Sequence, residues 1–155
     1  MSAMSGTIPW SATAEAVVLE RREYAGGVGA TIQMAHAHGL HTRPSAHLVG
    51  ALRREAREAK LSAYLEFECR GWVASMWTSR ASPTALIRLR ARQGDVVRVR
   101  AYGPDAGKAL DIVTWVLQQG TSTHEDAFTP EVDEALLEEF GSWEAIREWA
   151  LSGMR

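Results

Sequence analysis

Two hydrophobic periodicities alternate through the middle of the chain and predict its secondary structure. From residue 30 to residue 36 every second position is apolar or histidine, a period of two that is typical of a half-buried strand, and we expect this strand to end near His38. From Pro44 to Lys60 apolar residues recur every three or four positions, as on one face of a helix; they are Leu48, Val49, Leu52, Ala56 and Ala59. We therefore expect an amphipathic helix that begins close to His41.

The same periodicities continue to residue 120. Further strands are expected at residues 63–70, 72–77 and 97–102, the first two joined as a hairpin across Gly71, and helices are expected after Ser82 and over residues 104–119. Because strands and helices do not alternate strictly, the pattern favours an α+β fold, with an antiparallel sheet that carries helices on one face.

Two extensions flank this central region. Residues 1–27 form an N-terminal extension in which VVLERREY is either a strand or a loose arm. Residues 121–155 form an acidic extension with two expected helices: Thr129-Pro130 begins the first, and Gly141-Ser142 separates it from the second. We therefore divide the chain into residues 1–27, 28–120 and 121–155.

Composition and charge narrow the class of protein. The 155 residues are 46% hydrophobic and 23% charged, as in ordinary globular proteins. Apolar runs are far shorter than the roughly 20 residues that cross a bilayer, so we expect a cytoplasmic protein without membrane insertion. The single cysteine, Cys69, provides neither a disulfide framework nor a cysteine metal site. Residues 26–120 hold 13 basic and 7 acidic residues, whereas residues 121–155 hold 2 and 9, so a basic middle joins an acidic tail.

The segment from Gly39 to Pro44 carries the most specific chemistry. It places His41 immediately before a helix, and the first amides of a helix have no intrahelical partner and favour an anion. The guanidinium of Arg43 can donate two parallel hydrogen bonds to phosphate oxygens. Imidazole, with an ordinary pKa of about 6.5, is largely neutral and nucleophilic at cytoplasmic pH. This combination predicts a phosphoryl-accepting histidine.

On these residues the chain resembles the histidine-containing phosphocarriers (HPr) of the bacterial phosphoenolpyruvate-dependent phosphotransferase system. GLHTRPSAHLV is similar to the active-site signature of that family, and the likeness continues through the hairpin, QGDVVRVRAYGPD and the helix that contains Lys108. It extends over residues 28–118 with the same order of elements. The resemblance implies an open-faced sandwich of four antiparallel strands (βαββαβα), with the last strand beside both the first and the second, plus extra C-terminal helices.

The resemblance also implies roles for individual residues. Enzyme I would phosphorylate His41 on Nδ1 with a phosphoryl group from phosphoenolpyruvate, and the Arg43 side chain and the amides of Thr42 and Arg43 would hold the phosphate. Partner proteins would dock on Thr42, Ala46, His47 and Ile87. The chain would then be a monomeric carrier rather than an enzyme, would need no cofactor, and would pass the phosphoryl group to an enzyme IIA-type or regulatory protein.

Two positions depart from the family pattern or bear on regulation. His38 stands where the family has a small polar residue, close enough to the active loop to affect the stability of phosphohistidine. Ser82 matches a serine that is a regulatory phosphorylation site in some members. However, the loop before Gly94 is longer than usual, and Pro83 replaces an apolar residue. The alternative role of Ser82 is the N-cap of the short helix.

Metal and nucleic-acid binding are the alternatives for the remaining polar clusters. His36, His38 and His41 form a candidate metal cluster, but no carboxylate or cysteine is near in sequence, and we expect no metal. The arginines between residues 88 and 100 are compatible with nucleic acid. Cross-strand pairing of Arg98 and Arg100 with glutamates of the second strand is a simpler explanation, and we expect no nucleic-acid partner.

The acidic extension leaves the choice between a carrier and a regulator open. Its apolar residues at helical spacing favour packing on the domain, for which an open-faced sheet offers a surface, and we hypothesise that the extension tunes access by partners. The first functional hypothesis is a phosphocarrier. The alternative is an HPr-like regulatory module whose partner binding depends on phosphorylation of His41 or on the tail. The pathway that receives the phosphate is left open.

Overall fold

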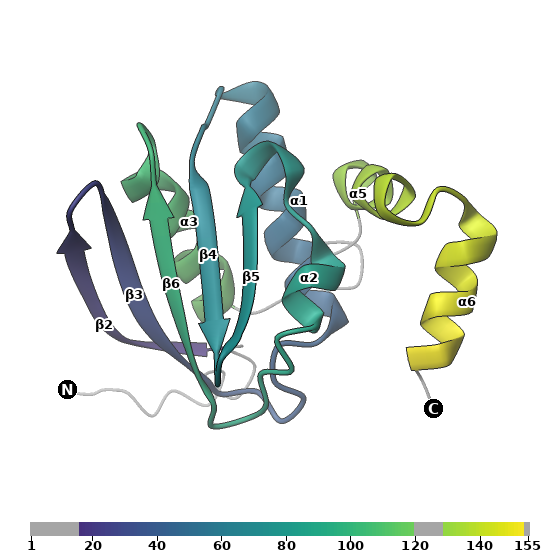
Figure 1. Cartoon of the computed structure of the whole chain (residues 1–155), viewed down its shortest axis with the longest axis horizontal. Helices are drawn as coiled ribbons and strands as arrows, with labels where there is room; N and C mark the ends of the chain where they lie inside the picture. Colours follow the sequence, from purple (N-terminus) through teal and green to yellow (C-terminus); the bar gives the residue numbers. More distant parts are fainter. Residues whose placement is uncertain (1–15, 120–128, 154–155) are drawn as a thin grey trace.

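A computed structural model of the chain, which describes residues 16–119 and 129–153, contains one five-stranded antiparallel sheet (Figure 1). The strands lie in the order β2-β3-β6-β4-β5. Their bounds are β2 Ala16–Tyr24, β3 Gly27–Met34, β4 Tyr64–Cys69, β5 Trp72–Trp77 and β6 Val96–Tyr102. The last strand lies between β3 and β4, as the resemblance implies, so the first and second strands of the predicted domain never touch each other.

The helices of the domain cover one face of this sheet and leave the other open (Figure 1). They are α1 (Thr42–Glu58), the 3-10 turn η2 (Thr78–Arg80), α2 (Pro83–Ile87) and α3 (Ala106–Gln119). Alternate strand residues such as Ile32, Phe67 and Val99 are buried against Leu48 of α1 and Leu110 of α3. The expected α+β fold with helices on one face of an antiparallel sheet is confirmed.

The expected count of four strands is one too few, because β2 adds an edge strand from the N-terminal extension. Strand β2 pairs with β3 from Tyr24↔Gly27 to Ala16↔Met34, with an irregularity between Val18 and Glu20. Of the nine residues only Ala16 is buried, so the strand lacks the alternation that marks a half-buried strand. Strand β3, in turn, ends at Met34 rather than near His38, because the chain turns at residues 36–38.

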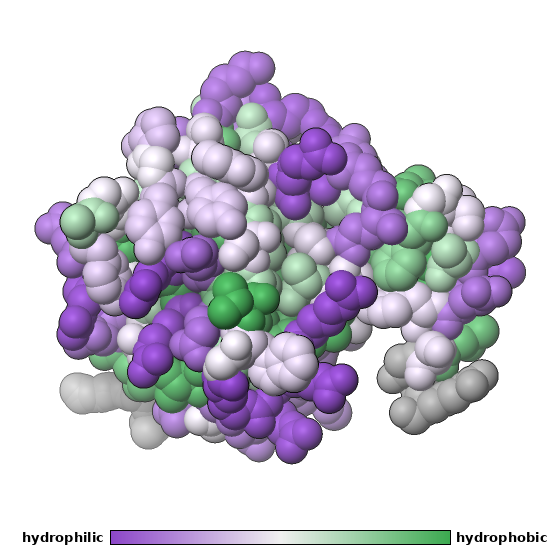
Figure 2. Space-filling model, viewed as in Figure 1, coloured by the Kyte–Doolittle hydropathy of each residue, from purple (hydrophilic) through white to green (hydrophobic). Residues whose placement is uncertain are grey.

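The open face of the sheet carries paired charges. Glu68 lies opposite Arg98, and Glu66 lies opposite Arg100, in the register of β4 and β6. The Arg98 guanidinium lies 3.3 Å from the Glu68 carboxylate. The cross-strand explanation is confirmed for Arg98, whereas the Arg100 guanidinium lies 5.1 Å from the centroid of the Tyr24 ring. Figure 2, in the same view as Figure 1, shows hydrophilic side chains interspersed with hydrophobic and weakly polar ones across this face.

The C-terminal extension forms the two expected helices, α5 (Pro130–Phe140) and α6 (Trp143–Gly153). Helix α5 packs on α1 and α2, on the helical side of the domain and not on the open face of the sheet, and α6 packs on α5 (Figure 1). Three arginines of α1 face glutamates of α5, and the shortest contacts are Arg53–Glu138 at 2.9 Å, Arg57–Glu134 at 3.0 Å and Arg54–Glu131 at 3.3 Å. Ion pairs between these arginines and glutamates therefore help to fix the position of α5 on α1.

Arg53 is the centre of this contact. Its side chain is only 5% exposed, its Nε donates to the Ala81 carbonyl over 3.0 Å, and its guanidinium also reaches Glu134 and Glu138.

Across the two described ranges of the chain, no helix is long and apolar enough to span a membrane.

Candidate functional site

A tight turn between β3 and α1 places His41 at the mouth of the helix. Gly39 has φ +63°, a conformation that a side chain disfavours, and a Cβ atom there would lie 2.1 Å from the Ala91 carbonyl oxygen. The amide of Leu40 donates to that same carbonyl over 2.9 Å. The turn is therefore clamped against residue 91, and only glycine fits at position 39.

His41 is the N-cap residue of α1, with extended backbone (φ −95°, ψ −168°). Its side chain makes no capping hydrogen bond to the helix, so the imidazole is not used to close the helix end. The His41 carbonyl accepts the Ser45 amide over 3.2 Å. In the first turn, Thr42 and Arg43 supply amides without intrahelical acceptors, whereas Pro44 has none to offer. Two amides and the positive end of the helix dipole are thus available to an anion.

The Arg43 side chain is exposed beside these amides. Within residues 16–119 and 129–153, no carboxylate forms an ion pair with it. A guanidinium in this position is free to bind phosphate oxygens in two parallel hydrogen bonds. Thr42 is exposed next to it, so both residues lie where the sequence predicts the phosphate pocket.

The environment of His41 keeps its imidazole neutral. The side chain is half-buried, and its desolvation, followed by the charges of His36, His38 and Arg43, lowers the pKa of His41 to about 4. The Nε2 atom is buried.

An NMR titration of the His41 ring protons should show a midpoint near 4 rather than near 6.5. Between those two values the unfolded chain binds more protons at this residue than the folded chain, so the His41 contribution to stability falls as the pH is lowered through that window. Phosphoryl acceptance should consequently show no loss from protonation of His41 as the pH falls from neutrality to about 5, since protonation begins only near 4. A midpoint near 6.5 would contradict the desolvation argument.

His36 and His38 lie against His41. The ring centroid of His41 is 5.1 Å from that of His36 and 5.6 Å from that of His38. The sequence alternation placed His36 and His38 on one strand face, but the turn after Met34 brings both rings to the helix end instead. Over the described part of the chain, no group of three or more histidine, cysteine or acidic side chains is arranged to hold a metal ion.

The predicted docking residues differ in accessibility. Thr42 is exposed, and His47 and Ile87 are half-buried. Ala46 is only 1% exposed, because it is packed against Val132 of α5. Gly50, one turn further along α1, lies under Thr129, whose Oγ1 would be 2.9 Å from a Cβ at residue 50. A partner can therefore reach Ala46 only after α5 has moved, which the sequence alone did not reveal.

Ser82 caps α2, as its position before Pro83 predicts. Its hydroxyl accepts the amide of Ala85 over 3.1 Å. The same hydroxyl and that of Thr84 contact the carboxylate of Glu139 at the end of α5. A phosphate on Ser82 would meet this carboxylate, so the acidic helix opposes modification at that position.

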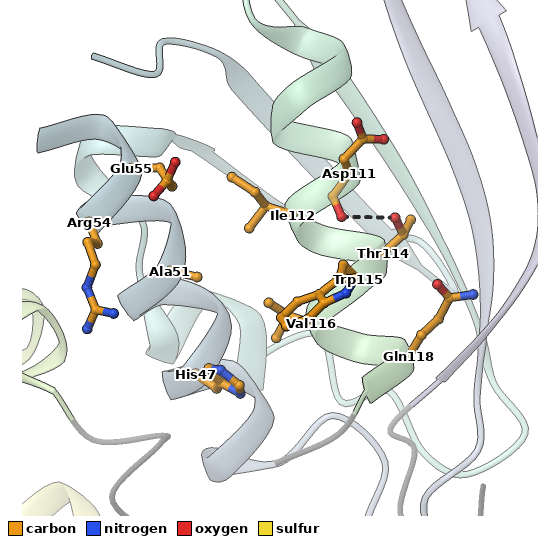
Figure 3. A pocket seen from close by; sticks show the side chains of 10 residues that line it. All are labelled: His47, Ala51, Arg54, Glu55, Asp111, Ile112, Thr114, Trp115, Val116 and Gln118. Atoms are coloured by element: carbon orange, nitrogen blue, oxygen red, sulfur yellow. Dashed lines mark hydrogen bonds between the residues drawn. The ribbon is translucent and has the colours of Figure 1, made fainter. Parts of the chain in front are cut away.

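A groove of about 640 Å³ lies between α1 and α3, and its lining begins at His47 near the start of α1 (Figure 3). Ala51 of α1 and Trp115 and Val116 of α3 provide its apolar surface. Two of its charged groups, Arg54 and Asp111, form ion pairs with Glu131 and Arg21. His41, Thr42 and Arg43 do not line the groove.

Comparison with known protein families agrees with this site. A family model described as the PTS HPr component phosphorylation site matches residues 28–119. No curated protein matches the chain. The match covers more than half of the sequence and includes β3, the turn, α1 and the rest of the domain through α3. The chain belongs to the HPr family of the phosphotransferase system, whose members are phosphocarriers rather than catalysts.

Proposed function

We propose that the chain accepts a phosphoryl group on Nδ1 of His41 from enzyme I, with phosphoenolpyruvate as the original donor, and passes it to an enzyme IIA-type or regulatory protein in the cytoplasm. One observation carries this proposal: a neutral imidazole with a buried Nε2 stands at the open N-terminus of α1 beside an exposed Arg43. The chain acts as a monomer and needs no cofactor, because the transfer chemistry uses only the histidine and the anion pocket.

The transfer is a displacement at phosphorus. The lone pair of Nδ1 forms a P–N bond while the bond from phosphorus to the donor breaks, and the electron pair of that bond leaves with the donor. The amides of Thr42 and Arg43, with the Arg43 guanidinium, receive the phosphoryl oxygens and their negative charge. In the second step an acceptor nucleophile displaces His41, which leaves as neutral imidazole. Because His41 has a low proton affinity, its ring can both accept and release the phosphoryl group at neutral pH.

The test of this function is incubation with phosphoenolpyruvate, magnesium and a compatible enzyme I. We expect one acid-labile phosphate per chain, a phosphorus NMR signal of Nδ1-phosphohistidine, and discharge to an enzyme IIA domain on the scale of seconds. No incorporation with a cognate enzyme I would remove the proposal. Incorporation on the Nε2 atom would contradict the orientation of the ring.

The position of α5 supports a further part of the proposal, namely that the extension limits access by partners. Val132 and the glutamates of α5 occupy the face of α1 that contains Ala46, near the phosphoryl site. A partner that brings phosphorus to His41 must contact the surface around it. Only molecules with α5 displaced then expose this whole face, so the apparent affinity for the partner equals the intrinsic affinity multiplied by the fraction of molecules in which α5 is displaced.

Val132→Asp is the variant that tests this limit. Val132 is fully buried, and a carboxylate at that position would displace α5 from α1. We expect the enzyme I-dependent phosphorylation rate to rise on the order of tenfold at limiting enzyme I, as the competent fraction increases. Leu151→Asp, on an exposed residue of α6, is the matched control and should leave the rate unchanged. Hydrogen exchange would show whether α5 is displaced in Val132→Asp. If it is displaced and both variants have the wild-type rate, α5 does not limit access by partners.

The same contact favours one alternative, a regulatory module that keeps its phosphate and is read by a partner. The observation behind it is that α5 is tied to α1 and α2 by ion pairs and by Glu139 at Ser82. The two functions separate kinetically. A carrier loses its phosphate to an acceptor within seconds, whereas a regulator binds its partner with phosphate-dependent affinity and retains the phosphate.

A further inference from the structure

The imidazole rings of His36, His38 and His41 lie together just before helix α1. Besides the two distances to His41, the rings of His36 and His38 are 5.3 Å apart, so the three centroids form a nearly equilateral triangle. The His36 and His38 rings are therefore neighbours of the ring that would carry the phosphoryl group. His36 and His38 precede the segment GLHTRPSAHLV that resembles the family signature.

The hydrogen bond inside the turn defines the tautomer of His36. The amide of His38 donates to Nδ1 of His36 over 3.1 Å. This nitrogen is therefore the acceptor, and the ring proton of neutral His36 is on Nε2. The turn therefore leaves His36 one ring donor, the N–H on Nε2. His38 makes no such ring bond among the described residues, and it is exposed.

Among the described residues, the charged groups near His36 and His38 include no carboxylate that is paired with either ring. Arg43 follows His41 at the start of α1, and Arg92 and Asp95 belong to the segment that clamps the turn at Ala91. Asp95 is engaged elsewhere: its carboxylate accepts the Arg92 amide over 2.8 Å and lies 3.5 Å from Arg70. No carboxylate between residues 16 and 119 or 129 and 153 forms an ion pair with His36 or His38.

We propose that His36 and His38 complete the phosphoryl pocket of His41 as positioning residues. His36 donates from Nε2–H to a phosphoryl oxygen, and His38 takes up one proton from solvent when the dianion arrives and then pairs with it as an imidazolium. No bond to phosphorus changes in this step. The pair stabilises phosphohistidine against hydrolysis until an acceptor arrives. This inference rests on the proposed phosphorylation of His41.

Three variants separate the two roles. His36→Phe keeps the ring but removes its donor, His38→Gln removes the titratable group, and His38→Lys keeps a positive charge across the neutral range. The control is Lys108→Gln, which removes a positive charge near Ala59, beyond the far end of α1. Each chain is phosphorylated with phosphoenolpyruvate and enzyme I, separated from enzyme I, and followed by the half-life of its phosphohistidine.

The half-life is measured at about pH 6 and at about pH 9, on either side of the range in which imidazole titrates. Relative to wild type at the same pH, His36→Phe should shorten it about tenfold at both values, the effect of a lost hydrogen bond to a charged group. His38→Gln should shorten it about tenfold at the lower pH and leave it unchanged at the higher. His38→Lys should match or exceed wild type at the lower pH, and Lys108→Gln should match wild type at both.

The outcomes distinguish this inference from the function on which it rests. If the wild type incorporates no phosphate, both are overturned. If the wild type is phosphorylated and the three histidine variants have its half-life at both pH values, the carrier function stands and the pocket assigned to His36 and His38 is wrong. A His38→Gln effect of equal size at the two pH values would likewise overturn the role of its proton.

Discussion

Replacing His41 by alanine is expected to abolish phosphate incorporation from phosphoenolpyruvate and enzyme I, because His41 is the N-cap residue of α1 and carries the imidazole next to the first-turn amides. The substitution should leave the fold intact, since the His41 side chain makes no capping hydrogen bond with the helix. Circular dichroism and the thermal unfolding midpoint provide the check of folding. Incorporation at or near the wild-type level in this variant would show that the phosphoryl group goes elsewhere.

Substitutions of Arg43 measure how much the phosphate pocket contributes to the phosphorylation rate. Arg43→Ala removes charge-assisted hydrogen bonds that contribute about 1.5–3 kcal/mol, so the phosphorylation rate should fall by about one to two orders of magnitude. Arg43→Lys should recover part of the loss, because it restores the charge but not the two parallel bonds. Lys108→Gln again serves as the control for removal of a positive charge.

Gly39→Ala is expected to have the second largest effect. An alanine at position 39 would lose about 1–2 kcal/mol of stability to the left-handed backbone and about 1–3 kcal/mol to overlap with the Ala91 carbonyl. The carbonyl cannot retreat without losing its hydrogen bond from Leu40. The free energy of unfolding should therefore fall by about 2–5 kcal/mol, and the phosphorylation rate should fall with it, because the turn that presents His41 is displaced.

Gly71→Ala is the matched comparison. Gly71 has φ +88°, but no atom lies within 4 Å of a Cβ built there, so only the backbone cost applies. Denaturant unfolding should give a loss of about 1–2 kcal/mol, with the phosphorylation rate of the folded protein unchanged. Should the two alanine variants lose the same stability and keep the same rate, the clamp at Ala91 would have no part in presenting the histidine.

Local sequence was enough to predict several features of the fold and the site. The helical spacing after Pro44 places the start of α1 at His41, and the alternation on either side of Gly71 predicts the hairpin of β4 and β5. Ser82 before Pro83 predicts the cap of α2, which its hydroxyl provides. These features depend on periodicity, turn residues and caps, all of which act between residues close together in the chain.

The N-terminal strand shows the limit of such reasoning. Strand β2 exposes Val17 and Leu19, at 50% and 53%, and is specified by pairing with β3 rather than by burial of alternate residues. An edge strand gains its hydrogen bonds from one neighbour and needs little hydrophobic alternation. The sequence therefore left residues 16–24 undecided between a strand and an arm.

What the sequence by itself determined is the chemistry at one place: a histidine at a helix start, followed by an arginine and a proline, in a chain whose tail is acidic. Only the tertiary structure decided that Val132 covers Ala46, that Arg53 is buried against α5, and that His36 and His38 meet His41. The reason is physical. Each of these contacts joins side chains through a turn or between distant segments, and their energies depend on distance, burial and charge in three dimensions.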